Sequence, residues 1–401
     1  MTDVVIVSAV RSAIGKFRGA LRDVHPADLG STVAKAAMER AGLEGGEVDE
    51  VVMSETYRAD LPGCSARPVA LRAGVPIEVP GVNLNMHCGT GLKAIVTAGQ
   101  MIRAGDAEAV LVVAMESMSR AAFLVRGARN GFALGHAIMV DQLVQKGDPA
   151  KDPAVDPTAA LSMGETAEVL AERYSISRDE QDQYACGSQA RAAAALREHR
   201  FAEQIVPVKV PAGKQGLIDF LVDEHPRPDT SLASLARLKP VFKAGGTVTA
   251  GNSSGMNDGA AALVLMSAER ARQRGLVPLA RLDGHAAVGV PPEVMGLGPV
   301  PATQKLLSRT GRRLEDFATI ELNEAFAAQV IGCLRAYPEL AEREAVMNVN
   351  GSGIALGHPI GATGAILAVK AIHELRRIGG GFGLLTMCIG GGQGIAVSIE
   401  A

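Results

Sequence analysis

The sequence predicts an α/β protein made of two duplicated halves, with a helical insertion in the first half. Three observations predict this fold: strand-like and helix-like segments alternate near both ends of the chain, their order is the same at both ends, and their spacing is nearly constant. Matching segments lie 264 to 273 residues apart, measured from Val82 to Val346, Val51 to Ile320, Gly89 to Gly361 and Leu111 to Leu384. Independent α/β domains would not keep such spacing, so it indicates an internal duplication.

The predicted elements of the two halves follow from their apolar patterns. In the first half, short apolar runs predict strands at 4–7, 50–53, 81–86 and 110–114. Helical periodicity predicts helices at 27–41 and 89–104, which end at Gly42 and Gly105, the residue type that most often follows a helix. The last third repeats the order, with strands at 281–288, 318–322, 346–350, 382–387 and 395–399 and helices at 302–309 and 361–377.

The duplication also locates an insertion. The last strand of the second half begins 7 residues after Cys388, whereas its counterpart at 263–266 begins 147 residues after Glu116, an excess of 140 residues. We expect this insertion to be a helical excursion rather than a third sheet. Its predicted parts are a Pro/Asp-rich linker at 147–157, a helix at 163–174, a helix from the capping box at Ser177 to about His199, and an irregular loop at 223–229. The predicted units are 1–119 with 245–272, the inserted loop domain 120–244, and 273–401.

Composition indicates a soluble, cytoplasmic protein of enzyme size. The 401 residues carry a net charge of −3, which gives no general attraction to nucleic acid or to acidic membranes. Five cysteines form no disulfide framework and indicate a reducing compartment. We expect no signal peptide, because the chain enters a strand at once, and no membrane span, because no apolar run approaches about 20 residues. Neither zinc-ligand spacing nor a P-loop is present in the sequence, so we expect no metal.

Two thiols lie where predicted strands end. Cys88 stands between a strand and the helix predicted from Gly89, whose positive end would favour the nucleophilic thiolate, and Gly89 and Gly91 would let a thioester carbonyl approach the backbone. Cys388 follows another strand and precedes Gly390, in a glycine run that allows close approach of a ligand. An inert buried cysteine is the alternative for each, and it is the interpretation we keep for Cys64, Cys186 and Cys333.

Two further polar residues occupy similar positions. His358 lies in a glycine-rich turn just before a predicted helix, whose N-terminus disfavours imidazolium and suits a neutral base. His87 is a rival base, although a strand geometry would point it away from Cys88. Asn323 follows the strand at 318–322, where its amide could hold a water or an oxyanion, or simply cap a turn.

These segments together resemble the thiolases, the acetyl-CoA acetyltransferases and 3-ketoacyl-CoA thiolases, across nearly the whole chain. The resemblance rests on six segments in the family's order: 82–91, 116–120, 249–259, 323–326, 350–361 and 388–394. It implies a five-layer α/β/α/β/α sandwich of two related halves with an inserted loop domain. It also implies acyl-CoA C-acyltransfer with acyl-CoA and coenzyme A as substrates, no bound cofactor, and a homodimer or homotetramer.

The resemblance implies a role for each candidate residue. Cys88 would take the acyl group, His358 would activate it, and Cys388 would move the proton at the acyl α-carbon. Asn323 would hold a water that forms one oxyanion hole with His358, and the N–H groups of Cys88 and Gly390 would form the other. Coenzyme A contacts would fall to Arg227, Ser234, Ala250, Ser254, Met163 and Phe326.

The sequence departs from the family's pattern in places that bear on the acyl group. Ser162 stands where acetoacetyl-CoA-forming members commonly have histidine, and 57–68 and 121–160 are atypical. If Ser162 lines the pocket, 3-ketoacyl-CoAs longer than C4 should be cleaved at least as well as acetoacetyl-CoA; Ser162 could instead be a loop residue without substrate contact. The alternatives are an acetoacetyl-CoA-forming biosynthetic thiolase, a condensing ketoacyl synthase, which Cys388 in place of a second histidine disfavours, and a thiolase-like acyl-CoA- or lipid-binding protein without turnover.

Overall fold

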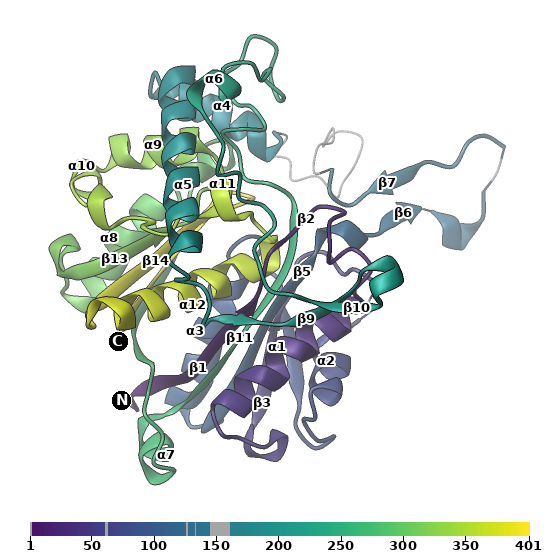
Figure 1. Cartoon of the computed structure of the whole chain (residues 1–401), viewed down its shortest axis with the longest axis vertical. Helices are drawn as coiled ribbons and strands as arrows, with labels where there is room; N and C mark the ends of the chain where they lie inside the picture. The colour runs from purple at the N-terminus through teal and green to yellow at the C-terminus, as the bar shows by residue number, and fades with distance from the viewer. Residues whose placement is uncertain (1, 61–62, 126, 133, 145–160) are drawn as a thin grey trace.

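The computed structural model describes the chain apart from residues 1, 61–62, 126, 133 and 145–160 (Figure 1). Nine of its strands form one continuous path in which neighbours are hydrogen-bonded. The order is β13 (Phe317–Leu322), β14 (Phe382–Ile389), β15 (Gln393–Glu400), β12 (Ala280–Gly289), β1 (Val4–Ser12), β11 (Asn257–Ser267), β5 (Ala109–Ser117), β3 (Glu50–Ser54) and β4 (Gly81–Leu84).

The path consists of two copies of one four-strand arrangement. In the first copy β3 is parallel to β5, and β5, β11 and β1 are antiparallel in turn; β13, β14, β15 and β12 repeat this order and these directions. Within the sheet the two copies are joined where β1 pairs with β12, Val5 with Arg281 and Ile6 with Ala280. The predicted duplication is confirmed.

Alternating side chains separate the layers. In β1, Val4 and Ile6 belong to one core, whereas Val5 and Val7 belong to another, as expected when successive side chains point to opposite faces. The first core contains α3 (Thr90–Ala104) and α12 (Ile360–Ile378), which contact each other and strands of both halves. On the outer faces lie α1 (Pro26–Arg40) and α2 (Ala66–Arg72) for the first half, and α8 (Pro299–Thr310) and α9 (Ala327–Ala336) for the second. These are the five layers that the resemblance implies.

One predicted strand is wrong. Residues 346–350 contain the end of a 3-10 helix, Glu344–Val346, and then a single bridge between Met347 and Ile320. The chain turns away because Asn348 adopts a left-handed conformation, with φ 49°. Its amide takes over the pairing with β13: Oδ1 accepts from the Leu322 N–H at 2.9 Å and Nδ2 donates to the Leu322 carbonyl at 2.8 Å. In the second half this bridge beside β13 occupies the position that β4 occupies beside β3 in the first half.

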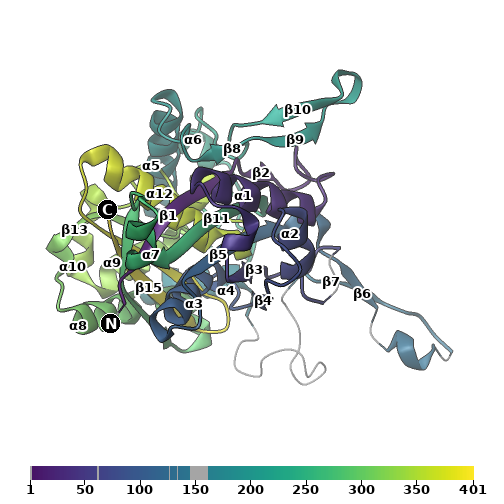
Figure 2. The ribbon, with the colours of Figure 1, turned by 90° about the horizontal axis from the view of Figure 1, so that it is seen from below.

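The insertion between β5 and β11 contains both predicted helices but is not purely helical. α4 (Met163–Arg173) and α5 (Arg178–Arg197) form, and Ser177 begins α5 through the predicted capping box. Two hairpins were not predicted: β6 (Phe123–Val125) with β7 (Met139–Asp141), and β9 (Val208–Pro211) with β10 (Leu217–Phe220). Their strands of three and four residues are too short for a clear alternating pattern. Figure 2 shows both hairpins extending away from the layers.

The remaining short elements complete the insertion and its borders. β8 (Ile205–Val206) pairs with β1, β2 (Gly15–Lys16) pairs with β11, and α6 (Leu232–Leu235), α7 (Ala268–Gln273), α10 (Pro338–Ala341) and α11 (Gly353–Leu356) are single turns or little more. The loop at 223–229 is irregular, as predicted, and the linker at 147–157 lies outside the described residues. Within the described chain, no helix has both the length and the apolar character that a membrane crossing requires.

Candidate active site

Cys88 lies in the turn between β4 and α3, and the chain reaches it through His87, whose φ is 46°. The backbone N–H of Gly390, from the turn after β14, donates to the Cys88 sulfur. Desolvation nevertheless raises the pKa of the Cys88 thiol to about 11, and the charge of Glu116 adds to this. The expectation that the N-terminus of α3 favours a thiolate is therefore wrong for the free protein, because burial outweighs the helix end.

Glycines 89 and 91 have a packing role that the sequence did not suggest. A Cβ on Gly91 would lie 2.6 Å from the Ala365 backbone nitrogen, and a Cβ on Gly89 would lie 2.3 Å from Ile389. A Cβ on Gly364 would likewise lie 2.3 Å from the Leu92 backbone nitrogen. Gly91 and Gly364 let α3 and α12 touch backbone to backbone, which fixes the two helix starts relative to one another, while Gly89 leaves room for the Ile389 side chain at the end of β14.

Cys388 lies at the end of β14 and is buried. It belongs to an apolar cluster at the insertion that includes Phe326 and, at its margin, Met163. Burial holds the pKa of its thiol well above the ordinary value, and the neighbouring Cys88 raises it further. The two thiols are thus close enough to influence each other, and both are protonated at neutral pH.

His358 lies between α11 and α12, and its ring is buried. Thr363 holds it from the first turn of α12, with 2.6 Å between Nδ1 and Oγ1. Because the Thr363 hydroxyl donates to the Pro359 carbonyl at 2.9 Å, it accepts from Nδ1–H, which leaves the lone pair on Nε2. Nε2 has no hydrogen-bond partner among the described residues, and burial lowers the pKa of His358 to about 4. The ring is a neutral acceptor.

Asn323 directly follows β13 and is completely buried. Its backbone N–H donates to the Thr386 carbonyl at 3.0 Å, yet neither amide atom of its side chain has a partner among the described residues. The residue lines a small cavity together with Gly357 and Thr363, on either side of His358. A buried amide without partners is costly, so this one suits a bound water or an oxyanion of the substrate.

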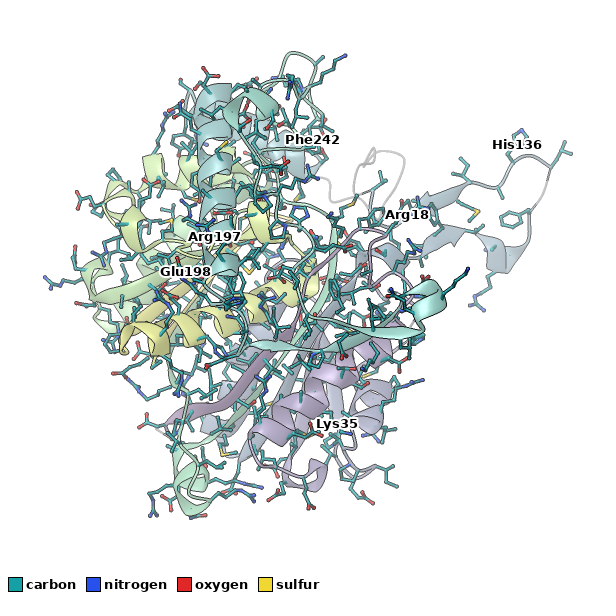
Figure 3. The ribbon with its side chains drawn as sticks, viewed as in Figure 1. Arg18, Lys35, His136, Arg197, Glu198 and Phe242 are labelled. Carbon is teal, nitrogen blue, oxygen red and sulfur yellow. The ribbon has the colours of Figure 1, made fainter. Side chains whose placement is uncertain are left out.

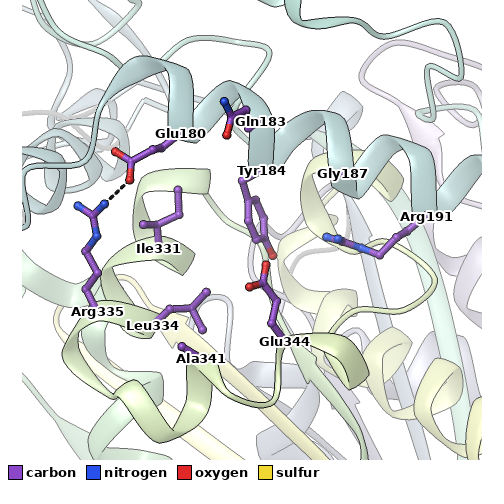
Figure 4. Close-up of a pocket in the computed structure, with 10 residues that line it drawn as sticks. All are labelled: Glu180, Gln183, Tyr184, Gly187, Arg191, Ile331, Leu334, Arg335, Ala341 and Glu344. Carbon is purple, nitrogen blue, oxygen red and sulfur yellow. Dashed lines mark hydrogen bonds and ion pairs between the residues drawn. The ribbon is translucent and has the colours of Figure 1, made fainter.

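The loop that carries Asn323 is anchored by its neighbour Glu324. This buried carboxylate accepts from Ser188 at 2.6 Å, from Tyr184 at 3.1 Å and from Arg191 at 3.5 Å, all on α5. Tyr184 and Arg191 also line a surface pocket between α5 and α9 (Figure 4). Helix α5 of the insertion therefore helps to place Asn323 by holding its neighbour Glu324.

The expected coenzyme A contacts divide into two groups. Met163 lies beside the glycine turn, since a Cβ on Gly390 would meet its sulfur at 3.3 Å, and Phe326 packs in the Cys388 cluster. Phe326 also meets the ring of Phe242 edge-on at 6.0 Å, and the Ser254 N–H donates to the Ala325 carbonyl at 2.9 Å. The second group, Arg227, Ser234 and Ala250, lies farther out: Arg227 and Ala250 are exposed, and Ser234 bonds within the turn of α6.

Ser162 has a different environment from the pocket position that the sequence suggested. It is the N-cap of α4 and forms a capping box with Glu165: its hydroxyl and its N–H both donate to Glu165 Oε2 at 2.8 Å. Its polar atoms are therefore committed to starting the helix. Met163, the next residue, is the one that faces the glycine turn.

Sequence reasoning missed three residues that shape the site. Thr363 orients His358, and Asn257 accepts the His358 backbone N–H at 3.0 Å across a close approach to Gly357, whose φ is 98°. Glu116 accepts from the N–H of Gly361 at 2.8 Å. Thr363 could have been suspected from its place five residues after His358, within the first helical turn; nothing in the sequence indicates the other two contacts. Among the described residues no cluster of histidine, cysteine, aspartate and glutamate has the form of a metal site.

Comparison with known proteins agrees with this architecture. The family models for the thiolase N-terminal and C-terminal domains match residues 4–269 and 276–401. An acetyl-CoA acetyltransferase of Pseudomonas aeruginosa is 45% identical over 399 residues, which are 100% of this chain and 99% of the relative. A beta-ketothiolase of Cupriavidus necator is 47% identical over 400 residues, 99% of each chain. The crystal structure of human mitochondrial 3-ketoacyl-CoA thiolase superposes with a TM-score of 0.93 at 40% identity, covering 100% of this chain and 99% of that one.

The fold and these matches define a duplicated α/β acyltransferase. The chain belongs to the thiolase family.

Proposed function

We propose that the protein cleaves 3-ketoacyl-CoA with coenzyme A to give acetyl-CoA and a shortened acyl-CoA, or runs the reverse condensation, through an acyl-Cys88 intermediate. The observation that carries the proposal is that the candidate residues stand in two groups at strand and helix ends: Cys88 with Gly390 and Cys388, and Asn323 on a small cavity whose lining flanks His358. The Gly390 N–H is aimed at the Cys88 sulfur, Cys388 is near enough to affect that thiol, and His358 and Asn323 present buried polar atoms without partners among the described residues.

In the first half-reaction the Cys88 sulfur attacks the C3 carbonyl of the substrate while Nε2 of His358 takes the thiol proton. The C2–C3 bond then breaks, and its electron pair stays on C2 as the enolate of acetyl-CoA. Cys388 donates its proton to C2, so acetyl-CoA leaves and the acyl group stays on Cys88. The N–H groups of Cys88 and Gly390 suit the tetrahedral oxyanion, and Asn323, through a water, with His358 suits the enolate oxygen.

The second half-reaction restores every proton. The Cys388 thiolate takes the proton of the incoming coenzyme A thiol, whose sulfur attacks the acyl carbonyl on Cys88. When the bond from the acyl carbon to the Cys88 sulfur breaks, that sulfur recovers its proton from His358. A solved human thiolase at 40% identity, with a TM-score of 0.92, contains coenzyme A, and here Met163, Phe326 and Ser254 would seat its inner part. Arg227, Ser234 and Ala250 would meet its outer part.

The preferred length of the acyl chain can be tested by comparing substrates. The apolar cluster around Cys388 supports a preference for 3-ketoacyl-CoAs longer than C4, and the Ser162 hydroxyl is committed to the helix start. Thiolysis of C4 to C16 substrates, with acetyl-CoA condensation alongside, would decide between this preference and an acetoacetyl-CoA-forming enzyme. A sharp maximum of kcat/KM at C4 would refute the preference. Ser162→His should shift the preference towards acetoacetyl-CoA, and an unchanged ranking would show that position 162 does not face the acyl group.

The intermediate is tested by mass spectrometry of peptides after brief exposure to a 3-ketoacyl-CoA without coenzyme A. The acyl group should be on the Cys88 peptide, and Cys88→Ser should lose turnover by orders of magnitude, since a hydroxyl is far less acidic than a thiol. Cys64→Ser is the matched control, because Cys64 is a free thiol on the surface. An adduct solely on Cys388 or Cys64 would overturn the assignment, and binding without any turnover would favour an acyl-CoA-binding protein.

We further expect a homodimer or homotetramer in the cytoplasm. The β6–β7 hairpin carries a row of exposed apolar side chains: Phe123, Leu124, Val125, Phe132, Leu134, Ile138 and Met139. Its tip, near His136, projects far from the layers (Figure 3), so a second copy could cover it. All five cysteines are free, which suits a reducing compartment. A monomer by light scattering at micromolar concentration would contradict the assembly.

A further inference from the structure

Glu116, at the end of β5, is a buried carboxylate for which the proposed reaction has no use. It is fully buried, and it lies in the segment 116–120 that resembles the family without an assigned role. Its two oxygens accept three backbone N–H bonds: Oε2 from Gly361 at 2.8 Å and from Thr56 at 3.2 Å, and Oε1 from Tyr57 at 3.1 Å. One side chain thus joins the first turn of α12 to the loop that follows β3.

Two of these bonds, from Gly361 and from Thr56, lead towards reacting groups. On one side, Gly361 stands two residues before Thr363, whose hydroxyl holds Nδ1 of His358 at 2.6 Å. On the other side, the Thr56 hydroxyl donates to the carbonyl of His87 at 3.3 Å, and His87 directly precedes Cys88. Glu116 is therefore the shared support of the turn that carries the base and the turn that carries the nucleophile.

The duplication explains why a carboxylate is found here. The end of β14 reaches the start of α3, where the Gly390 N–H meets Cys88; the end of the matching strand β5 reaches the start of α12, where Glu116 meets Gly361. Each strand end thus faces the first turn of the other half's helix. In the first half the strand end contributes an acceptor for helix N–H groups, which the positive end of a helix favours.

The surroundings leave Glu116 little freedom to be replaced. A Cβ on Gly361 would lie 2.9 Å from Oε2 and 3.0 Å from the Thr56 nitrogen, so the helix start and the loop are already in contact around the carboxylate. Burial raises the pKa of Glu116 to about 8; the charge of Glu55, which accepts from the Ser65 hydroxyl, raises it further, while the three backbone N–H bonds lower it. Glu55 makes none of the three backbone bonds, so it does not share the bridging role.

We propose that Glu116 is a positioning residue that sets the distance and orientation of His358 relative to Cys88. It makes no contact with the substrate in this role, so its loss should slow the chemical steps while coenzyme A still binds. The inference rests on the proposed thiolase reaction. Failure of the unmodified protein to cleave any 3-ketoacyl-CoA would refute that reaction, whereas the variants below test only the positioning.

The test compares Glu116→Gln with Asp49→Asn in the full chain. Asp49 is a matched control because its Oδ2 also accepts two backbone N–H bonds, from Glu108 and Ala109 at 2.8 Å each, at the opposite end of β5. In Glu116→Gln the amide nitrogen replaces one acceptor and opposes at least one buried N–H. We expect kcat, per folded active site, to fall at least about tenfold with KM for coenzyme A changed less than about twofold. Asp49→Asn should keep the unmodified kcat.

Two outcomes would overturn the role. If folded Glu116→Gln keeps the kcat of the unmodified protein, the bridge is not needed. If KM for coenzyme A rises at least about tenfold while kcat stays constant, the residue has a binding role instead. If Glu116→Gln does not fold, Thr56→Val removes only the branch to His87; it should lower kcat and slow the acylation burst on Cys88 while the melting temperature changes little. A Thr56→Val protein with the unmodified burst rate would equally refute the proposal.

Discussion

The pair of Cys88 and His358 should rest in its neutral form, a thiol beside an imidazole. Burial raises the pKa of Cys88 to about 11 and lowers that of His358 to about 4, a difference of about 7 (11 minus 4). Taken one group at a time, at about 1.36 kcal/mol for each pKa unit, moving the proton from sulfur to ring in the free protein costs on the order of 10 kcal/mol, from which the attraction between the two resulting charges is subtracted. A resting thiolate–imidazolium pair is therefore rare, and the transfer must accompany attack on the substrate, when the N–H groups stabilise the new oxyanion.

The assay is alkylation of Cys88 by iodoacetamide, followed by mass spectrometry of the Cys88 peptide from pH 6 to 10. Only the thiolate reacts, and far below its pKa the thiolate fraction rises about tenfold for each pH unit. The rate should therefore climb across the whole range without a plateau. His358→Gln should change the rate at pH 7 only slightly, because in the neutral pair the ring does not hold the thiolate.

A contrary result would be easy to recognise. An alkylation rate that is constant between pH 6 and 8, and that drops sharply in His358→Gln, is the behaviour of a preformed ion pair. It would show that the surroundings of Cys88 and His358 are more polar than their burial implies. The reasoning about the free protein would then be wrong, although Cys88 could still be the nucleophile.

Three further predictions follow from the same contacts. Asn323→Ala should lower kcat about 100- to 1,000-fold with a smaller change in KM, because it removes an oxyanion-stabilising donor. Steady-state thiolysis would check this, and a rise in KM as large as the fall in kcat would contradict it. Thr363→Val should lower kcat about tenfold by freeing the His358 ring, and Thr32→Val is its control, because the partly exposed Thr32 hydroxyl also donates to a backbone carbonyl, that of Asp28 at 2.7 Å on α1. Below about pH 6.5 the unfolded chain protonates His358 more readily than the folded protein, so stability should fall towards pH 4 by up to about 3 kcal/mol, and less in His358→Gln.

The layers were predictable because local patterns and long-range spacing agree. β5 is a continuous apolar run that is buried on both faces, and α3 and α12 end at glycines with φ 82° and 97°. The strand expected at 346–350 failed because one asparagine amide can replace two backbone hydrogen bonds, and hydrophobic periodicity does not record such a substitution. The two hairpins of the insertion failed because their strands are too short to show a period.

The positions of the candidate residues were predictable, but their electrostatic states were not. Cys88, His358, Asn323 and Cys388 each follow a strand or precede a helix, and such ends can be read from the sequence. Burial cannot be read in this way: the helix end beside Cys88 predicts a lowered pKa, while the packing of both halves around the thiol raises it. The tautomer of His358 depends likewise on Thr363, whose hydroxyl already donates to a carbonyl.

The duplication gives these contacts a common origin. α3 and α12 pack backbone to backbone through Gly91 and Gly364, so their first turns lie side by side, and each first turn faces the strand end of the other half. The contact between the end of β14 and the start of α3 holds Cys88 beside Gly390, and the contact between the end of β5 and the start of α12 bonds Gly361 to Glu116. A substitution that separates α3 from α12 should therefore weaken both of these contacts together. Gly91→Ala, whose Cβ would lie 2.6 Å from the Ala365 nitrogen, should lose more activity than Gly187→Ala on α5, whose nearest neighbour, at 3.4 Å, is the end of a flexible arginine.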